Sequence, residues 1–349
     1  MNALSPSPAE SPPVIAIVGA TGAVGVELLG CLERRGFPAR QVRLLASARS
    51  AGRPMAFRGG EITVEELTDE SFTGVDIAFF SAGATISRRF APIARAAGAR
   101  VIDNSSAFRM DEAVPLVVPE ANGALLEADP PLVANPNCVA AIATVALAPI
   151  HRRWSIRRLH MATYQAASGA GAAAVQELMD GTRAALDGQP FEPQVMPHPF
   201  AFNIFSHNAD IDPGTGYNGE ELKVVAETRR ILGLPALPIG VTCIRVPILR
   251  AHGIALSIRF EDYVTPEQVR AALDGAPGLR LVDDRAANHF PMPSEATGAD
   301  EVLVGRIRTD LGDPSGRTIA MFVVGDQLLK GAALNAVQIA EALPARVPA

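Results

Sequence analysis

The sequence is poor in cysteine, in positive charge and in long apolar runs. Its three cysteines, Cys31, Cys138 and Cys243, are too few and too widely spaced for a disulfide framework or a zinc cluster. With 31 Lys and Arg against 37 Asp and Glu, the net charge is -6, which gives no basic surface for nucleic acid or an anionic membrane. No apolar run is long enough to span a bilayer. We therefore expect a cytoplasmic protein with reduced thiols.

The first thirteen residues differ in composition from the rest of the chain. They are rich in Pro, Ser and Ala, and they have neither the basic start nor the apolar core of a signal peptide. We interpret residues 1–13 as a disordered leader. The total length of 349 residues is sufficient for two domains, each with its own core.

A dinucleotide-binding unit is predicted directly after the leader. Residues 14–18 (VIAIV) form a short apolar run, typical of a strand buried on both faces of a parallel sheet. The glycine-rich turn 19–25 (GATGAVG) follows at once, and a helical pattern covers residues 26–35. Glycines in such a turn let the backbone approach a pyrophosphate held at the helix N-terminus.

The second predicted strand, residues 42–46, indicates which dinucleotide is bound. An NAD-binding unit places a carboxylate at the end of this strand, and none is present here. Ser47, Arg49 and Ser50 follow instead, and an arginine between serines suits a ribose 2′-phosphate. The cofactor is therefore predicted to be NADP(H), the alternative being a solvated polar loop. Strands at 75–80 and 101–103 continue a doubly wound sheet.

A candidate nucleophile follows this first half of the chain. The turn 135–138 (NPNC) precedes an Ala-rich apolar run, 139–150, which has the length of a helix. Cys138 would then lie in the first helical turn, where free N–H groups and the helix dipole favour a thiolate. The alternative is a buried structural cysteine.

The second half has the mixed pattern of an α+β domain. Glu220 and Lys223 share one face of a predicted helix, Arg245 lies on a strand, and His252 follows that strand. His198 and His207 lie in an irregular segment and are predicted to be structural. The predicted elements are strands at 158–165, 242–248, 254–260 and 318–324, and helices at 172–186, 220–232 and 328–343, the last returning to the first domain.

Long motifs, in order along the chain, resemble the aspartate-β-semialdehyde dehydrogenase family, most closely its plant and cyanobacterial-like branch. The resemblance covers nearly everything after the leader. It rests on GATGAVG (19–25), LASARSAG (45–52), NSSAFRM (104–110), VVPEAN (117–122), NPNC (135–138), TYQAASGAG (163–171), EELK (220–223), CIRVPILRAH (243–252), DDRAANHFP (283–291) and GDQLLKGAALNAVQIAE (325–341).

The resemblance implies a fold and a reaction. The fold is a Rossmann-type NADP-binding domain, residues 14–137 completed by 328–345, and a catalytic and dimerisation domain, residues 138–327. The reaction is the reductive dephosphorylation of L-4-aspartyl phosphate to L-aspartate 4-semialdehyde through a cysteine thioester. It serves the biosynthesis of Lys, Thr, Met and Ile. A homodimer or homotetramer is implied, with a small-molecule substrate and inorganic phosphate as partners and no metal.

The resemblance also implies a role for each matching residue. Cys138 would be the nucleophile and His252 the acid/base, Gln165 would orient the substrate, Arg245 would bind its carboxylate and Glu220 its amino group, and Arg109 and Lys223 would bind phosphate. The NADP site would be formed by Gly19, Thr21, Gly22, Ala23, Val24, Arg49, Ser50, Ser168, Gly169 and Gln327.

Three positions depart from the family pattern, and two other functions remain open. Val139 and Ala141 stand where the family usually has Ser and Ile, and Ile254 stands where it usually has Glu. One alternative is a related acyl-phosphate reductase such as N-acetylglutamyl-phosphate reductase, against which Glu220 and Arg245 argue, because an acetylated amine needs no carboxylate partner. The other is a non-catalytic paralogue that binds ligands, against which the retention of the Cys/His pair argues.

Overall fold

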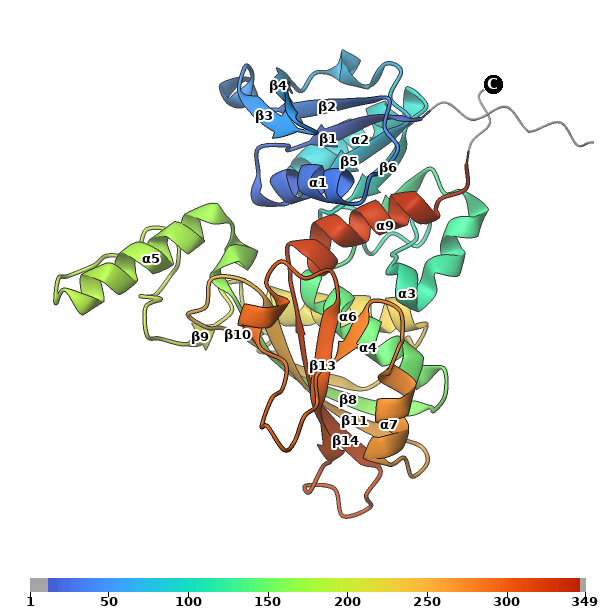
Figure 1. Ribbon diagram of the computed structural model, residues 1–349, viewed down its shortest axis with the longest axis vertical. Coiled ribbons are helices and arrows are strands. Elements are labelled where there is room, and N and C mark those ends of the chain that lie inside the picture. The colour runs from blue at the N-terminus through green and yellow to red at the C-terminus, as the bar shows by residue number, and fades with distance from the viewer. Residues whose placement is uncertain (1–11, 346–349) are drawn as a thin grey trace, which may run out of the picture.

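The computed structural model describes residues 12–345, which form two seven-stranded sheets (Figure 1). The predicted leader, apart from residues 12 and 13, lies outside the described residues. The first sheet has the order β3-β4-β2-β1-β5-β6-β7 and is parallel except for β3. Its strands are β1 (Val14–Val18), β2 (Gln41–Ala46), β3 (Pro54–Phe57), β4 (Gly60–Glu66), β5 (Ile77–Phe80), β6 (Arg100–Asp103) and β7 (Leu132–Ala134).

The predicted dinucleotide-binding unit is confirmed. All five residues of β1 are buried, as expected for a central parallel strand, and α1 begins at Ala23. The helices that accompany this sheet are α1 (Ala23–Arg34), α2 (Ala84–Ala96) and the short α3 (Pro119–Asn122). The glycine turn therefore lies at the carboxyl end of β1, where open α/β sheets bind their ligands.

The second sheet is mixed, with the order β12-β13-β14-β11-β8-β10-β9. Strands β8 and β10 are parallel, whereas β11 is antiparallel to both β8 and β14. Its strands are β8 (Ile156–Gln165), β9 (Phe205–Ser206), β10 (Ile239–Arg245), β11 (His252–Phe260), β12 (Leu279–Leu281), β13 (Val302–Thr309) and β14 (Thr318–Gly325). The strand predicted at 242–248 extends beyond the end of β10, because the chain leaves the sheet after Arg245.

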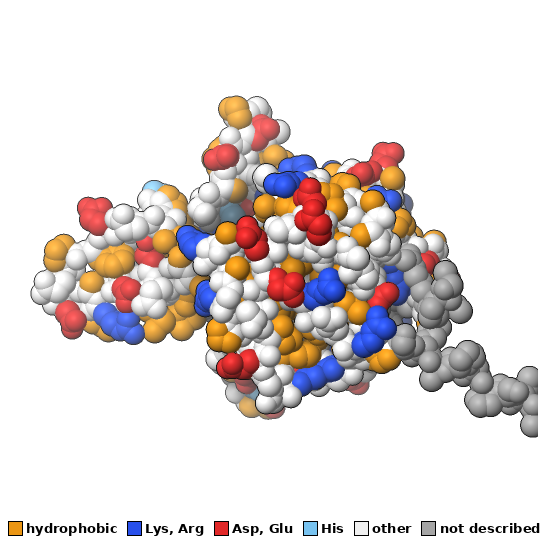
Figure 2. All heavy atoms as spheres, turned by 90° about the horizontal axis from the view of Figure 1, so that it is seen from above, with side chains coloured by type: hydrophobic (Ala, Val, Ile, Leu, Met, Phe, Trp, Pro, Cys, Tyr) orange, Lys and Arg blue, Asp and Glu red, His pale blue; other side chains and the backbone are white. Residues whose placement is uncertain are grey.

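Three helices cover one face of the second sheet. They are α4 (Cys138–His151), α6 (Gly219–Leu232) and α7 (Pro266–Leu273), and α4 and α6 lie between the two sheets (Figure 1). The single turn α8 (Pro293–Ala296) packs on the other face against Leu303 and Val324. α5 (Ala172–Leu186), whose bounds match the prediction, projects to one side as an arm (Figures 1 and 2). No helix within residues 12–345 combines the length and the apolarity needed to cross a bilayer.

The end of the chain returns to the first sheet, as predicted. After β14 the chain forms a π-helical turn, Leu329–Ala333, and then α9 (Leu334–Ala342), which packs against α1 and shares a core with β1 (Figure 1). The prediction of one continuous helix over 328–343 missed the π turn. A π turn shifts the backbone by one residue and is frequent at functional sites. The domain boundaries at 137/138 and 327/328 stay predictions.

A buried ion pair fastens this returning segment. The Lys330 ammonium lies 2.5 Å from Oε2 of Glu120 and 2.7 Å from Oε1 of Gln338. Its side chain is 1% exposed and that of Glu120 is 8% exposed. Burial lowers the pKa of Lys330, and the Glu120 carboxylate opposes that shift. The pair therefore depends on both partners, because either charge alone would be buried without compensation.

Glu120→Ala is expected to lower the free energy of unfolding by about 3–5 kcal/mol, because it leaves the Lys330 ammonium buried without a carboxylate. Urea denaturation measures the loss. Asp69→Ala is the matched control, since Asp69 forms an exposed ion pair with Arg89, and it should cost less than about 1 kcal/mol. Equal small losses in both variants would contradict the importance of the buried pair.

Candidate active site

A cavity of about 660 Å³ brings most of the predicted site residues together. It lies where the carboxyl end of the first sheet meets the second sheet. Six predicted catalytic or substrate residues line it: Cys138, Gln165, Glu220, Arg245, His252 and Arg109. Predicted cofactor residues line the same cavity: Ala23, Val24, Ser168, Gly169 and Gln327. Lys223 is exposed and does not line it, and neither do Gly19, Thr21, Gly22, Arg49 and Ser50.

Cys138 is the first residue of α4, as predicted, but the expectation of a thiolate is wrong for this site. Asn137 caps the helix, and its Oδ1 accepts from the N–H groups of Val139 (2.9 Å) and Ala140 (3.4 Å). Burial raises the pKa of Cys138 to about 12, and the Glu220 carboxylate adds to the rise. The half-buried thiol is therefore protonated at neutral pH, because desolvation outweighs the helix terminus.

The π turn packs closely against Cys138. A Cβ placed on Gly331 would lie 2.7 Å from the Cβ of Cys138. No side chain fits in that gap, so glycine at this position is what allows the C-terminal segment to pass Cys138. The contact also restricts the directions in which the Cys138 side chain can point.

His252 begins β11 and is fully buried beside the cavity. Its Nδ1 accepts the N–H of Ala166 at 3.0 Å, which assigns the neutral tautomer with its proton on Nε2. Nε2 has no partner among the described residues and lies next to Gly169, where a Cβ would be 3.1 Å away. Burial lowers the pKa of His252 to about 3, with the nearby Arg245 as the next contribution. The ring therefore presents a hydrogen-bond donor to the cavity.

Arg245 and Gln165 are register partners at the carboxyl ends of two parallel strands. The Arg245 side chain is buried and donates to the carbonyl of Ala166 (3.1 Å) and, through Nη2, to Oδ1 of Asn208 (3.1 Å). No carboxylate within residues 12–345 forms an ion pair with it at 4.0 Å or less. Burial lowers its pKa. A buried guanidinium without a carboxylate partner suits an anionic ligand.

Glu220 is held from two sides. Its Oε1 accepts from Asn137 Nδ2 (2.9 Å) and from Gln165 Nε2 (3.1 Å). Burial acts to raise its pKa, but the charge of His207 and these two hydrogen bonds hold the pKa below its usual value. Glu220 is therefore a buried carboxylate with its second oxygen available to a cation. The exposed Lys223 contributes a smaller effect in the same direction.

Several residues of the site were not identified in the sequence. Glu227 accepts from the Asn137 N–H (2.5 Å) and forms an ion pair with Arg109 (3.2 Å). It lies seven residues after Glu220, two turns along the same helix face, so helical spacing could have indicated it. His207, predicted to be structural, lines the cavity with Nε2 2.8 Å from Nη2 of Arg245. His198, in contrast, packs on a phenylalanine ring outside the cavity.

The glycine turn fits a dinucleotide. Gly19 has φ +83°, and a Cβ there would lie 2.9 Å from the backbone carbon of Ser81, so the turn requires glycine. Gly22 caps α1 without a side-chain hydrogen bond, and the first turn has no acidic residue. The helix N-terminus is therefore open to an anion. Thr21 Oγ1 lies 3.5 Å from Ser50 Oγ, which brings the turn and the end of β2 together, and Arg49 is exposed beside them.

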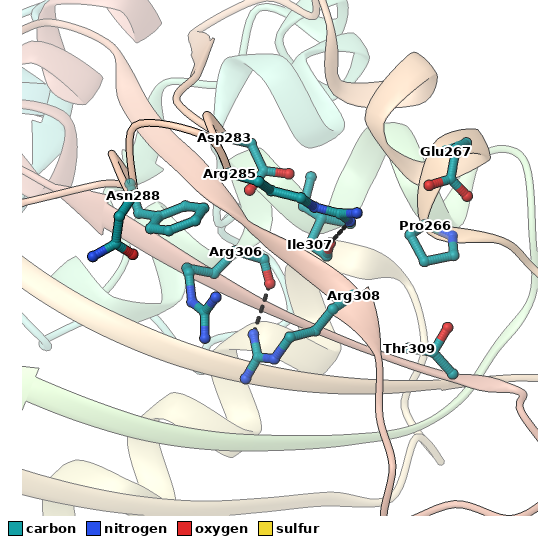
Figure 3. Close-up of a pocket in the computed structure, with 10 residues that line it drawn as sticks. Pro266, Glu267, Asp283, Arg285, Asn288, Arg306, Ile307, Arg308 and Thr309 are labelled. Atoms are coloured by element: carbon teal, nitrogen blue, oxygen red, sulfur yellow. Dashed lines mark hydrogen bonds between the residues drawn. The ribbon is translucent and has the colours of Figure 1, made fainter.

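A different cavity, of about 480 Å³, lies beside strand β13 (Figure 3). Arg285, Arg306 and Arg308 line it, and the Arg306 guanidinium stacks on the Phe290 ring at 4.8 Å. Its lining includes neither a cysteine nor a histidine, and none of the predicted site residues. The cavity that contains Cys138 is therefore the better candidate for the active site.

The three departures from the family pattern are all in the interior. Val139, Ala141 and Ile254 are fully buried and belong to the core cluster that joins α4 to the second sheet. They surround the Cys/His pair with apolar groups, which agrees in direction with the low pKa of His252. The residues are therefore packed as core and offer no polar group to the cavity. Within residues 12–345, no group of three or more His, Cys, Asp or Glu could hold a metal ion.

Comparisons with known proteins agree with this fold. Family models described as "Semialdehyde dehydrogenase, NAD binding domain" and "Semialdehyde dehydrogenase, dimerisation domain" match residues 14–128 and 147–330. The class defined here is thus an NAD(P)-binding semialdehyde dehydrogenase with a second, dimerisation domain.

The similarity extends to particular relatives. The chain is 46% identical over 336 residues to an aspartate-semialdehyde dehydrogenase of Synechocystis (96% of this chain, 98% of the relative) and 45% identical to that of Bacillus subtilis (94% and 96%). A Vibrio cholerae structure, aspartate semialdehyde dehydrogenase II complexed with ASA, superposes with a TM-score of 0.91 at 39% identity (96% and 98%). The chain belongs to the aspartate-semialdehyde dehydrogenase family.

Iodoacetamide is expected to label Cys138 before Cys31 and Cys243, because Cys138 faces the cavity and the other two are buried. The rate should rise about tenfold per pH unit between pH 7 and 9, since only the thiolate reacts and the pKa of Cys138 is about 12. Peptide mapping by mass spectrometry measures both effects. A rate that levels off below pH 8 would instead reveal a stabilised thiolate.

Gly331→Ala is expected to lower kcat and to destabilise the fold by about 1–3 kcal/mol, because the new methyl group overpacks the Cβ of Cys138. Gly123→Ala is the control, since a Cβ there meets nothing closer than 3.9 Å. Steady-state kinetics and thermal denaturation measure the two effects. If both variants behave like the unchanged protein, the turn is not tightly packed on the nucleophile.

Proposed function

We propose that this protein is an NADP-dependent aspartate-semialdehyde dehydrogenase. It would convert L-4-aspartyl phosphate to L-aspartate 4-semialdehyde and inorganic phosphate, a cytoplasmic step in the biosynthesis of Lys, Thr, Met and Ile. The observation that carries the proposal is the meeting of Cys138, His252, Arg245 and Glu220 in one cavity. The names of the similar proteins support aspartate semialdehyde over an N-acetylated substrate.

The substrate would be held by opposite charges. Arg245, which has no carboxylate partner of its own, binds the α-carboxylate, and Glu220 binds the amino group. Gln165 lies between them and donates to Glu220 (3.1 Å), so it orients the substrate. Arg109, which also lines the cavity, takes the phosphate, with Lys223 adding positive charge from the exposed helix face. An N-acetyl group would leave the Glu220 carboxylate without a cation.

The chemistry follows from the protonation states. The Cys138 sulfur bonds to the acyl carbon, the carbon–oxygen bond to phosphate breaks, and the thiol proton leaves with the phosphate. His252 already carries a proton on Nε2, so it donates a hydrogen bond to the acyl oxygen, where negative charge develops. One such donor contributes about 3 kcal/mol in comparable sites. A thioester on Cys138 results, which divides one difficult step into two easier ones.

The glycine turn, with Ser168, Gly169 and Gln327, would hold NADPH, which would supply the hydride for reduction of this thioester. His252 Nε2–H again donates to the oxygen of the tetrahedral species, and breaking of the carbon–sulfur bond then releases the aldehyde. The Cys138 thiolate regains its proton from water. In both steps the neutral His252 acts as a hydrogen-bond donor, and its pKa of about 3 keeps it neutral throughout.

The deciding experiment is phosphate-dependent reduction of NADP⁺ with aspartate semialdehyde. Turnover should require phosphate and should be abolished in Cys138→Ser, while the circular dichroism spectrum stays unchanged. N-acetylglutamate semialdehyde should react at least 100-fold more slowly. Absence of turnover with the natural chain, or a preference for the acetylated aldehyde, would refute the proposal.

We further infer a homodimer formed through the face of the second sheet opposite α4, α6 and α7, where α8 covers only the part near Leu303 and Val324. On this face several residues of β8, β11 and β14 are half-buried or exposed, including His160, Tyr164 and Phe322, whereas Gly253 and Val324 are buried. Tyr164 and Phe322 form an edge-to-face pair with ring centroids 6.1 Å apart. Apolar side chains at the end of α5 and in the segment that follows it, such as Leu186 and Phe202, are also exposed and would suit a further contact in a homotetramer.

NADPH should be preferred over NADH by at least an order of magnitude, because Arg49 and Ser50 lie at the end of β2 where an NAD enzyme carries an acid. Arg49→Ala should remove most of the preference, since a charge-assisted contact contributes roughly 1.5–3 kcal/mol. The ratio of kcat/KM for the two cofactors measures it. Arg53→Ala, a nearby exposed arginine, serves as the control. Equal use of both cofactors by the natural chain would exclude a 2′-phosphate site.

A further inference from the structure

Arg250 joins the two halves of the molecule immediately before the catalytic histidine. Its Nη1 lies 2.5 Å from Oε1 of Glu27 on α1, and its Nε lies 2.6 Å from Oδ2 of Asp326, which follows β14. Glu27 belongs to the helix that opens with the glycine turn, whereas Arg250 and Asp326 belong to the second half. One side chain thus links the cofactor helix to the segment that leads into His252.

The backbone between Arg250 and His252 has little freedom. Ala251 is fully buried and has φ +70°, a left-handed conformation that costs a non-glycine residue of order 1 kcal/mol or more. Its N–H donates to Oε1 of Gln327 at 2.8 Å, and Nε2 of Gln327 donates to Ser168. Strain of this kind persists only where the surroundings hold the residue in place. The contacts of Arg250 and Gln327 hold Ala251 in this conformation.

The two halves of the ion-pair chain differ in burial. The Asp326 side chain is fully buried and also accepts from the N–H groups of Gly298 and Leu328. The Glu27 side chain is 18% exposed and that of Arg250 is 24% exposed. Asp326 therefore fixes Arg250 to the second half permanently, while the contact with Glu27 is the part that a movement of α1 can break.

We propose that Arg250 is a positioning residue that couples the cofactor helix α1 to the placement of His252. This inference rests on the proposed function, because it assigns the glycine turn to the dinucleotide. Residues Ala23 and Val24 of the first turn of α1 line the cavity, and Glu27 lies one turn further along the same helix. A ligand that fixes the position of α1 therefore fixes the distance from Glu27 to Arg250. That distance in turn determines the conformation of the backbone before His252. By linkage, the ordering of His252 raises cofactor affinity in turn.

Glu27→Gln tests the coupling, because it removes the charge, keeps the shape and leaves the buried Asp326 pair intact. We expect kcat to fall about tenfold while KM for aspartate semialdehyde changes less than twofold. NADP⁺ should change the alkylation rate of Cys138 at least threefold in the natural chain and less than 1.5-fold in the variant. Arg250→Lys, which keeps the charge but cannot reach both carboxylates, should be intermediate.

Glu341→Gln is the matched control, since Glu341 pairs with Arg35 at 2.7 Å beyond the other end of α1, away from the cavity. It should leave kcat and the NADP⁺ effect unchanged. The inference is overturned if Glu27→Gln retains the natural kcat and the natural NADP⁺ effect, or if NADP⁺ does not change alkylation in the natural chain. Absence of turnover in the natural chain refutes the proposed reaction instead, because alkylation and NADP⁺ binding are measured without it.

Discussion

Asn137 holds the site together through the hydrogen bonds of its side chain and its backbone. Its Oδ1 caps α4, its Nδ2 donates to Glu220 and its backbone N–H donates to Glu227. These contacts fix the start of the helix that carries Cys138 against α6, which carries both carboxylates. Without them Cys138 and Glu220 would be placed by two separate helices. The geometry of the candidate site therefore depends on a capping residue that is not itself one of the proposed catalytic residues.

Burial is the second constraint, and it decides the protonation of the catalytic pair. Desolvation disfavours both the Cys138 thiolate and the His252 imidazolium, so the thiol and the imidazole are neutral. Arg245 and Glu220 keep their charges because hydrogen bonds or nearby groups compensate them. The cavity thus combines a neutral thiol and imidazole with charged groups, an arrangement that agrees with the zwitterionic substrate proposed above. Apolar residues such as Val139 and Ile254 strengthen the same effect.

Local patterns were sufficient for much of the fold. The strand, glycine turn and helix at the start were predicted because each is encoded by neighbouring residues: a buried apolar run, φ-permissive glycines and a helical period. The bounds of α5 and the position of Cys138 at a helix start followed in the same way. The π turn was missed, because the Gly331 contact with Cys138 that it accommodates joins residues almost two hundred positions apart.

The sequence by itself thus determined the family, the two-sheet architecture and the types of residue in the site, since motifs and periodicity are properties of short segments. The tertiary structure alone decided how those residues behave. The pKa of Cys138, the tautomer of His252 and the contact of His207 with Arg245 depend on burial and on partners from distant segments. Glu227, ninety positions from Asn137, shows the same limit. Desolvation and Coulomb interactions act through space, so they are set only once the two sheets have met.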